Sequence, residues 1–240
     1  MKLQNEDLLH GLTVEELSRL LHVRRITSPL FRLSISKADA EKLLQAAYLK
    51  EVGTRQIAFS ASPLLKELIA AIAASLTEER GCTGMLFIGT CGSGKTTMLR
   101  AIQSMTCFLN ERDALRFPDI LSVKDSKEIV SVCKSSSNIY AQGEIPMLGI
   151  DDFGDEPKEI TEFGNVRTPL VDLLEYRYDR QRFTIITSNL TMDEIRSKYG
   201  IRLLNRFAEM GRFFIFPEVS YRVPKLFNVN DIVSPKKRNC

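Results

Sequence analysis

The segment from Gly89 to Thr96 constrains the fold more than any other part of this 240-residue chain. It reads GTCGSGKT, which matches the phosphate-loop pattern GxxxxGK[ST], and it lies between an apolar run at 85–88 and a helical pattern at 97–109. Glycines allow the backbone to curl so that its N–H groups and the helix N-terminus surround a phosphate. The alternative is a glycine turn with a chance lysine, but the strand before it and the helix after it favour a nucleotide-binding loop.

The side chains at the end of this loop have expected chemical roles. Lys95 is expected to reach the β and γ phosphates of a nucleotide, and Thr96 to place its hydroxyl on Mg²⁺. The rest of the loop is expected to contact the phosphates mainly through its backbone. The predicted nucleotide-binding residues are Gly89, Thr90, Cys91, Gly92, Ser93, Gly94, Lys95, Thr96 and Thr97.

Polar residues end two further strand patterns. Asp151 and Asp152 end the apolar run at 147–150, which places both carboxylates at the carboxyl edge of a parallel sheet, where ligands of open α/β folds bind. In this Walker B pattern, Asp151 is expected to hold Mg²⁺ and Asp152 to polarise the attacking water. Asn189 ends the pattern FTIITSN and is able to orient water, although an Asn at a strand end is more often a turn residue.

The chain alternates strand and helix patterns. Apolar runs at 85–88, 147–150, 183–187 and 213–216 are separated by helical segments, which predicts an α/β fold with a mainly parallel sheet between helices. Before them, capping signals predict three helices and a small helical N-terminal region. These signals are Thr13 with Glu16, Ser36 with Asp39, and Ser62 with Pro63, the last helix being expected to end at Gly81.

Composition excludes several classes of protein. The chain is 44% hydrophobic and 26% charged, its longest apolar stretches fall well short of the ~18 residues of a membrane span, and its start does not resemble a secretory signal. We therefore expect a cytoplasmic protein without membrane contact. Five cysteines without paired spacing indicate free thiols, and a net charge of +3 alone does not establish a nucleic-acid partner, although residues 225–240 form a basic tail.

Longer blocks carry a specific resemblance. IDDFGDEP, FGNVRTPLVDLLEYRYD, FTIITSNLT and YGIRLLNRFAEM, in this order, resemble the DnaC, DnaI and IstB group of AAA+ ATPases, which includes bacterial helicase loaders and transposition helpers. The resemblance covers roughly residues 60–216 and is weak for 1–60. It implies a P-loop NTPase with an AAA+ core at 61–224. Only a short segment follows Phe216, which leaves little room for the helical lid of larger AAA+ proteins, so we expect a reduced or absent C-terminal lid. The apolar stripes of the helical region at 1–60 are expected to pack on each other or on the main domain, with partner binding as the alternative.

The resemblance also implies roles for individual residues. Asn189 matches sensor 1, and Arg206 matches the arginine finger that one subunit offers to its neighbour's nucleotide. Arg202 lies four residues earlier and is expected on a similar side of the helix, although both arginines could belong to a solvated surface. Asn205 departs from the Ser of the family, Asp152 replaces the Glu of many AAA+ proteins, and no sensor 2 arginine is assigned.

As a whole, the resemblance implies a slow Mg²⁺-dependent ATPase. Its expected partners are ATP, single-stranded or duplex DNA bound without base readout, a replicative helicase or a transposase, and further copies of itself in a head-to-tail ring or spiral. A small-molecule kinase is one alternative, which the paired aspartates and Arg206 disfavour. A non-catalytic nucleotide-binding module is another, which Lys95, Thr96 and Asp151 disfavour.

Overall fold

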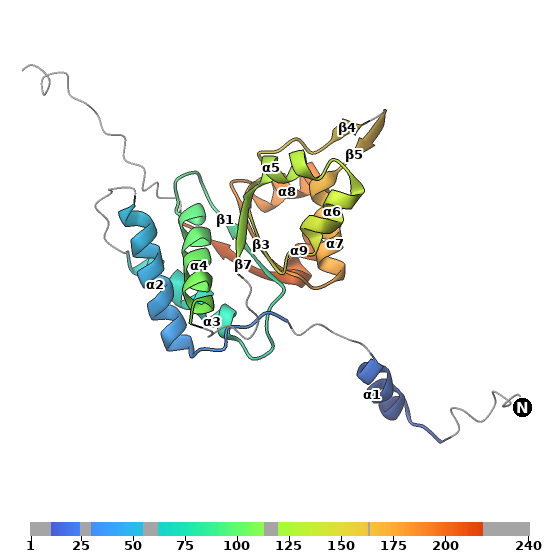
Figure 1. The fold of residues 1–240 in the computed structure, drawn as a ribbon, viewed down its shortest axis with the longest axis horizontal. Coiled ribbons are helices and arrows are strands. Elements are labelled where there is room, and N and C mark those ends of the chain that lie inside the picture. Colours follow the sequence, from blue (N-terminus) through green and yellow to red (C-terminus); the bar gives the residue numbers. More distant parts are fainter. Residues whose placement is uncertain (1–10, 25–29, 55–61, 113–119, 163, 218–240) are drawn as a thin grey trace, which may run out of the picture.

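A parallel sheet runs through the middle of the molecule (Figure 1). In this computed structural model, which describes residues 11–24, 30–54, 62–112, 120–162 and 164–217, five strands pair in the order β2-β3-β6-β1-β7. All neighbouring pairs are parallel, as predicted from the apolar runs. The strands of this sheet are β1 (Gly84–Ile88), β2 (Ser122–Asp125), β3 (Met147–Phe153), β6 (Phe183–Ser188) and β7 (Gly211–Ile215), and a separate hairpin contains β4 (Ile160–Glu162) and β5 (Asn165–Arg167).

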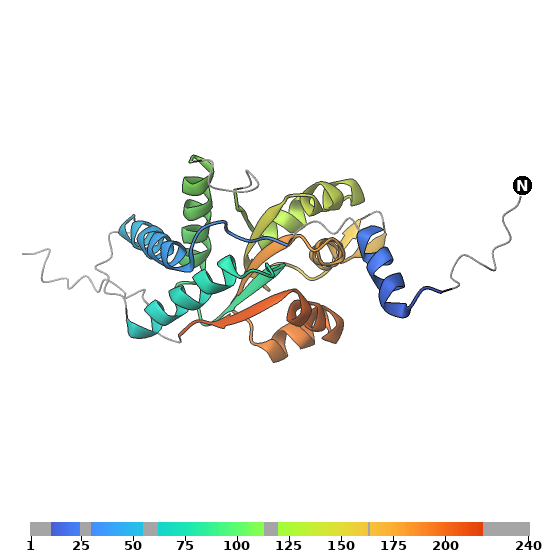
Figure 2. The same cartoon turned by 90° about the horizontal axis from the view of Figure 1, so that it is seen from below.

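Helices cover both faces of the sheet (Figures 1 and 2). On β1, Met85 and Phe87 join the apolar cluster beneath α2, α3 and α4, whereas Leu86 and Ile88 join the cluster beneath α5, α7, α8 and α9. This alternation follows from the two-residue period of a strand. The helices are α1 (Val14–Arg24), α2 (Lys37–Gly53), α3 (Pro63–Thr77), α4 (Lys95–Asn110), α5 (Ser126–Val132), α6 (Ser136–Gly143), α7 (Pro169–Asp179), α8 (Met192–Tyr199) and α9 (Ile201–Met210).

The three predicted N-terminal helices form behind the predicted caps. Ser36 and Ser62 accept hydrogen bonds from the backbone of the first turns of α2 and α3, and Thr13 exchanges bonds with Glu16 at α1. α2 shares one apolar cluster with α3 and α4, while α1 lies apart from the body in the view of Figure 1. The domain boundaries at residues 60 and 224 stay predictions, and the predicted basic tail at 225–240 lies outside the described residues.

Some element bounds differ from the expectation. α3 ends at Thr77 rather than near Gly81, because Glu78 already adopts an extended backbone. β3 continues through Asp151 and Asp152 to Phe153, so the two aspartates do not end the strand as predicted. The strands β2, β4 and β5 were not predicted, because they are short and lack the apolar runs that mark the other strands.

The side chain of Arg177 ties α7 to the sheet. It is fully buried, and its guanidinium donates to the carbonyl oxygens of Gly143 (3.0 Å) and Phe183 (2.6 Å) and to Oγ1 of Thr184 (2.9 Å). Burial lowers the pKa of Arg177 to about 9. Because its partners are neutral oxygens on α6, on β6 and on the chain before β3, this arginine fixes the C-terminal end of α7.

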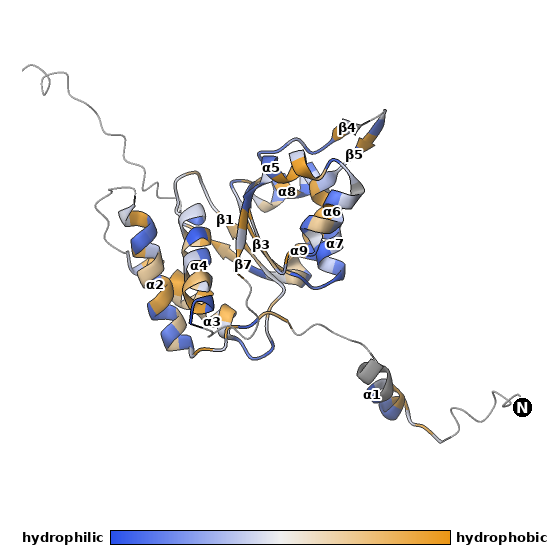
Figure 3. Ribbon diagram, viewed as in Figure 1, coloured by the Kyte–Doolittle hydropathy of each residue, from blue (hydrophilic) through white to orange (hydrophobic). Residues whose placement is uncertain are grey.

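Hydrophobic and hydrophilic residues are distributed as in a water-exposed α/β protein. In Figure 3 the helices around the sheet carry both kinds of residue, as expected where one side of a helix is buried and the other exposed. None of the helices in the described part of the chain combines the length and apolar character that a membrane crossing requires.

Candidate functional site

The predicted site residues meet at the carboxyl ends of three adjacent strands. The phosphate loop follows β1, Asp151 and Asp152 lie near the end of β3, and Asn189 follows β6. Since β6 pairs with both β1 and β3, these three segments emerge side by side. The sheet thus brings together site residues that lie up to a hundred positions apart in the sequence.

Glycine backbones shape the loop between β1 and α4. Gly92 (φ 84°) and Gly94 (φ 101°) adopt left-handed conformations, and Gly94 is the N-cap of α4. Such conformations favour glycine and direct successive N–H groups toward one point. At Gly89, a Cβ atom would lie 2.9 Å from the side chain of Phe216, so only glycine fits there. The backbone is therefore shaped to surround an anion at the start of a helix.

The ammonium group of Lys95 lies inside this loop. Lys95 is only 4% exposed, and its Nζ donates to the carbonyl oxygens of Gly89 (2.7 Å) and Thr90 (2.9 Å) and to Oδ1 of Asn189 (2.8 Å). Each of these oxygens is neutral. A cation at this position, inside the loop and at the start of α4, is suited to bind a phosphate. Ser93 and Thr97 are also buried, whereas Thr90 and Cys91 are exposed.

Thr96 and Asp151 form a pair of oxygen ligands. The Thr96 hydroxyl donates to Oδ1 of Asp151 at 2.9 Å, and the buried Thr187 hydroxyl donates to the same oxygen at 2.6 Å. Mg²⁺ prefers such hard oxygen donors and is held by few protein groups together with phosphate oxygens and water. The donor set therefore fits Mg²⁺, with Thr96 and Asp151 as the residues that would hold it.

Asp152 lies at an irregularity of β3. Between Ile150 and Phe153 the pairing with β6 shifts, and Asp152 has a φ of 55°, which a non-glycine residue rarely adopts. Its N–H donates to Oγ1 of Thr187 (2.9 Å), and its carbonyl accepts from Oγ of Ser126 (2.8 Å). These bonds stabilise the unusual backbone conformation of Asp152. Because of this irregularity, the side chains of Asp151 and Asp152 do not follow the regular alternation of a strand.

The carboxyl group of Asp152 has a raised pKa. Burial is the main cause, and the neighbouring charges of Asp151, Asp155 and Asp125 act in the same direction, while Lys95 opposes them. Nδ2 of Asn189 lies 3.5 Å from Oδ1 of Asp152, and Oδ1 of the same amide accepts from Lys95. Asn189 therefore connects the two charged groups on which the predicted chemistry depends.

The two arginines of α9 lie elsewhere. α9 covers the opposite face of the sheet from α4. Arg202 Nε lies 3.3 Å and Arg206 Nη1 lies 2.6 Å from Oε1 of Glu175 on α7, so the two guanidinium groups share one side of the helix as predicted. Among the polar contacts of the described residues, Arg206 meets Glu175 and the ring of Tyr178 rather than the phosphate loop.

Sequence reasoning missed several residues that hold the site. Thr187 fixes both the Asp151 carboxylate and the Asp152 backbone, and Ser126 supports Asp152 from α5. A threonine just before the end of a buried strand was the available signal for Thr187. Glu175 gave no comparable signal, because its partners lie 27 and 31 residues away, on another helix.

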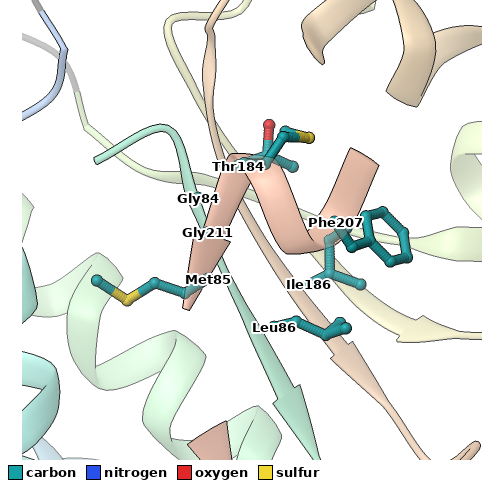
Figure 4. Close-up of a pocket in the computed structure, with 8 residues that line it drawn as sticks. Gly84, Met85, Leu86, Thr184, Ile186, Phe207 and Gly211 are labelled. Atoms are coloured by element: carbon teal, nitrogen blue, oxygen red, sulfur yellow. The ribbon is translucent and has the colours of Figure 1, made fainter. Parts of the chain in front are cut away.

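A small pocket lies at the other end of β1 (Figure 4). Its lining is mostly apolar, and Thr184, which contributes a polar side chain, already accepts from Arg177. β1 begins at Gly84 in this pocket, whereas the phosphate loop follows the end of β1. The pocket is thus separate from the candidate site. It is lined by Gly84, Met85, Leu86, Thr184, Ile186, Phe207, Met210 and Gly211.

Comparisons with known proteins identify the fold. No protein-family model and no curated protein sequence matches the chain. It is similar to a solved Streptococcus pyogenes serotype M3 structure described as a candidate primosome component, with 21% identity, a TM-score of 0.50, and coverage of 73% of this chain and 98% of that chain. Weaker likenesses are to DnaI (16% identity, TM-score 0.49, covering 79% and 98%) and to the DnaC helicase loader (19%, 0.44, 67% and 94%). Together with the strand order and the phosphate loop, the first likeness confirms the predicted AAA+ P-loop fold.

Proposed function

We propose that this chain binds and hydrolyses ATP with Mg²⁺, and that it acts as a helicase loader in DNA replication. One observation carries the proposal: Asn189 contacts both Lys95 and Asp152, while Thr96 contacts Asp151, so every predicted catalytic group of one subunit meets at one sheet edge. A loader is favoured over a transposition helper because the similar structure at TM-score 0.50 is described as a primosome component.

The residues of the site have different roles in phosphoryl transfer. Lys95 and the loop N–H groups bind the β and γ phosphates. Asp152 accepts a proton from the attacking water or polarises it, and Asn189 orients that water. Thr96 and Asp151 would hold Mg²⁺, which would supply positive charge to offset the negative charge of the phosphates.

Arg206 supplies the remaining positive charge to a neighbouring subunit. Its contacts among the described residues are with Glu175 and Tyr178 of α7 rather than with the phosphate loop, which supports a role at the nucleotide of another copy of the chain. Head-to-tail contacts of this kind generate rings or open spirals. ATP hydrolysis then depends on assembly, which is a suitable property for a protein that acts on DNA and on a replicative helicase.

A mixing experiment tests the division between subunits. Arg206→Ala provides a sound phosphate loop without a finger, and Lys95→Ala provides a finger without a usable loop. Arg206→Ala alone is expected to be nearly inactive, because an arginine supplied in trans is worth about a thousandfold or more in turnover. Lys95→Ala alone is expected to be nearly inactive because it lacks the ammonium group that binds the β and γ phosphates. The mixture should regain part of the activity at interfaces that pair an intact loop with an intact finger. Normal ATP hydrolysis by dilute Arg206→Ala would overturn the assignment.

A second experiment tests the partner. Purified replicative helicase and single-stranded DNA are offered to the full chain with ATP or with ADP, and complexes are separated by size. The loader proposal expects a helicase complex that forms with ATP and dissociates with ADP, and DNA binding that weakens steeply with salt. A complex with a transposase but not with the helicase would instead favour the transposition helper.

A further inference from the structure

The guanidinium group of Arg206 is withdrawn in this structure. Its side chain is 14% exposed, and its Nη1 is fully covered although it makes no well-aligned hydrogen bond. The Arg202 side chain, one turn earlier on α9, is 73% exposed. An arginine that stabilises charge on another subunit's nucleotide must present its N–H groups outward. Arg206 must therefore move before it is able to act.

One carboxylate oxygen holds both arginines. Oε1 of Glu175 lies 2.6 Å from Nη1 of Arg206 and 3.3 Å from Nε of Arg202. On its other side, Arg206 lies over the ring of Tyr178, with Cζ 5.1 Å from the ring centroid. Glu175 and Tyr178 both belong to α7. The surface of α7 therefore provides an anionic partner and an aromatic partner that compete with any phosphate for Arg206.

α7 itself is held firmly. Leu173 and Leu174 are buried in the apolar cluster of this face, and the fully buried Arg177 ties the helix to the sheet. Glu175 lies between these anchors and is 30% exposed. The backbone that carries Glu175 is thus fixed, and Arg206 approaches it with a long side chain that has several rotatable bonds. A rotamer change of Arg206 breaks the contact without a movement of α7.

We propose that Glu175 is a positioning residue that retains Arg206 against α7 in the free subunit and releases it when a neighbour's nucleotide arrives. This inference rests on the proposed finger role of Arg206. The ion pair is a suitable latch because a partly exposed pair is weak enough to be displaced by a more highly charged group. Nucleotide hydrolysis is then low in the free subunit because no neighbour supplies a finger to its site, and the latch adds a free-energy cost to the release of Arg206 when subunits assemble.

The isosteric variant Glu175→Gln tests the latch. It removes the charge while keeping the side-chain shape, so Arg206 is released more easily. The protein concentration that gives half-maximal ATPase activity should fall by about five-fold, the upper end of what a partly exposed ion pair contributes. Glu175→Asp keeps the charge and should stay near the unsubstituted protein. ATP affinity and thermal unfolding of both variants verify that the fold and the phosphate loop are intact.

The mixing assay shows on which subunit Glu175 acts. Placed in the Lys95→Ala chain, which donates the finger, Glu175→Gln should lower the half-maximal concentration. Placed in the Arg206→Ala chain, which offers only the loop, it should change nothing. A structural effect of the substitution would not distinguish the two chains.

The possible failures are separable. Full activity of Arg206→Ala at every concentration would show that Arg206 is not an arginine finger. The proposed role of α9 at a neighbour's nucleotide would then be wrong as well. An inactive Arg206→Ala together with an unchanged Glu175→Gln would overturn the latch alone. A lower maximal rate of Glu175→Gln at saturating protein would also overturn it, because Glu175 would then present the arginine rather than retain it.

Discussion

The sheet edge and the α7–α9 surface hold their charged groups in opposite ways. At the edge, Asp151 accepts hydrogen bonds from two segments, Thr96 and Thr187, and the Asp152 backbone is bonded to Thr187 and Ser126. On the surface, two arginines share a single oxygen of Glu175 as their anionic partner. The first arrangement fixes groups for chemistry within one chain, and the second allows a group to leave. A division of the reaction between subunits explains both.

The largest expected effect distinguishes binding from chemistry at the fixed edge. Asp152→Asn should reduce ATP turnover by about 100- to 10,000-fold, because the group that polarises water loses its charge. ATP affinity should change little, since Lys95, Thr96 and Asp151 remain. Single-turnover hydrolysis and equilibrium titration measure the two quantities separately. Full activity of this variant would show that another residue polarises the attacking water, and Asn189 would be the next candidate.

The next effect compares the two regions directly. Lys95→Ala removes the buried ammonium group, and ATP affinity should fall by about 10- to 100-fold, as expected for a hydrogen-bonded charge worth ~1.5–3 kcal/mol. Arg206→Ala, measured as a dilute subunit, should bind ATP normally. Titration with a fluorescent ATP analogue measures both. Equal losses in the two variants would mean that the α9 surface belongs to the nucleotide site of its own chain.

A smaller effect concerns the support of the magnesium ligand. Thr187→Val keeps the shape of the side chain but removes the hydroxyl that donates to Asp151 and accepts from the Asp152 N–H. The Mg²⁺ concentration for half-maximal ATPase activity should rise about five-fold, since a hydrogen bond of this kind is worth ~1 kcal/mol. Thr187→Ser retains the hydroxyl and is the matched control. If both variants behave alike, the hydroxyl does not orient Asp151.

The difference between the two regions also separates what the sequence predicts from what it does not. Phosphate-loop chemistry depends on local spacing, so Gly89 to Thr96 were identified without knowledge of the fold. The parallel sheet followed from apolar runs, and it brought Asp151 and Asn189 to the predicted edge. The irregularity at Asp152 was not predictable, because it arises from the pairing of β3 with β6.

Pairing across helices was harder still to foresee. The partnership of Glu175 with the α9 arginines depends on how α7 packs against α9, which no spacing in the sequence encodes. Arg177 was missed for a different reason. Arginine is expected at the surface unless it is paired with an acid, yet here the guanidinium is fully buried among backbone oxygens.

The smallest predicted effect is on the pH dependence of hydrolysis. Burial and the charges of Asp151, Asp155 and Asp125 raise the pKa of Asp152, so its active, ionised form is lost at a higher pH than for an ordinary aspartate as the pH falls. Asp155→Asn removes one of these like charges, which should move the acidic limb of the turnover profile to lower pH. The shift should be small, because Asp155 is 47% exposed and its charge is screened by water. Lys127 lies 4.0 Å from Asp155, and Lys127→Met breaks that contact while keeping the carboxylate, so its acidic limb should not move to lower pH. Profiles measured at saturating Mg·ATP compare the three proteins, and an acidic limb that is identical in Asp155→Asn would show that another group controls the reaction.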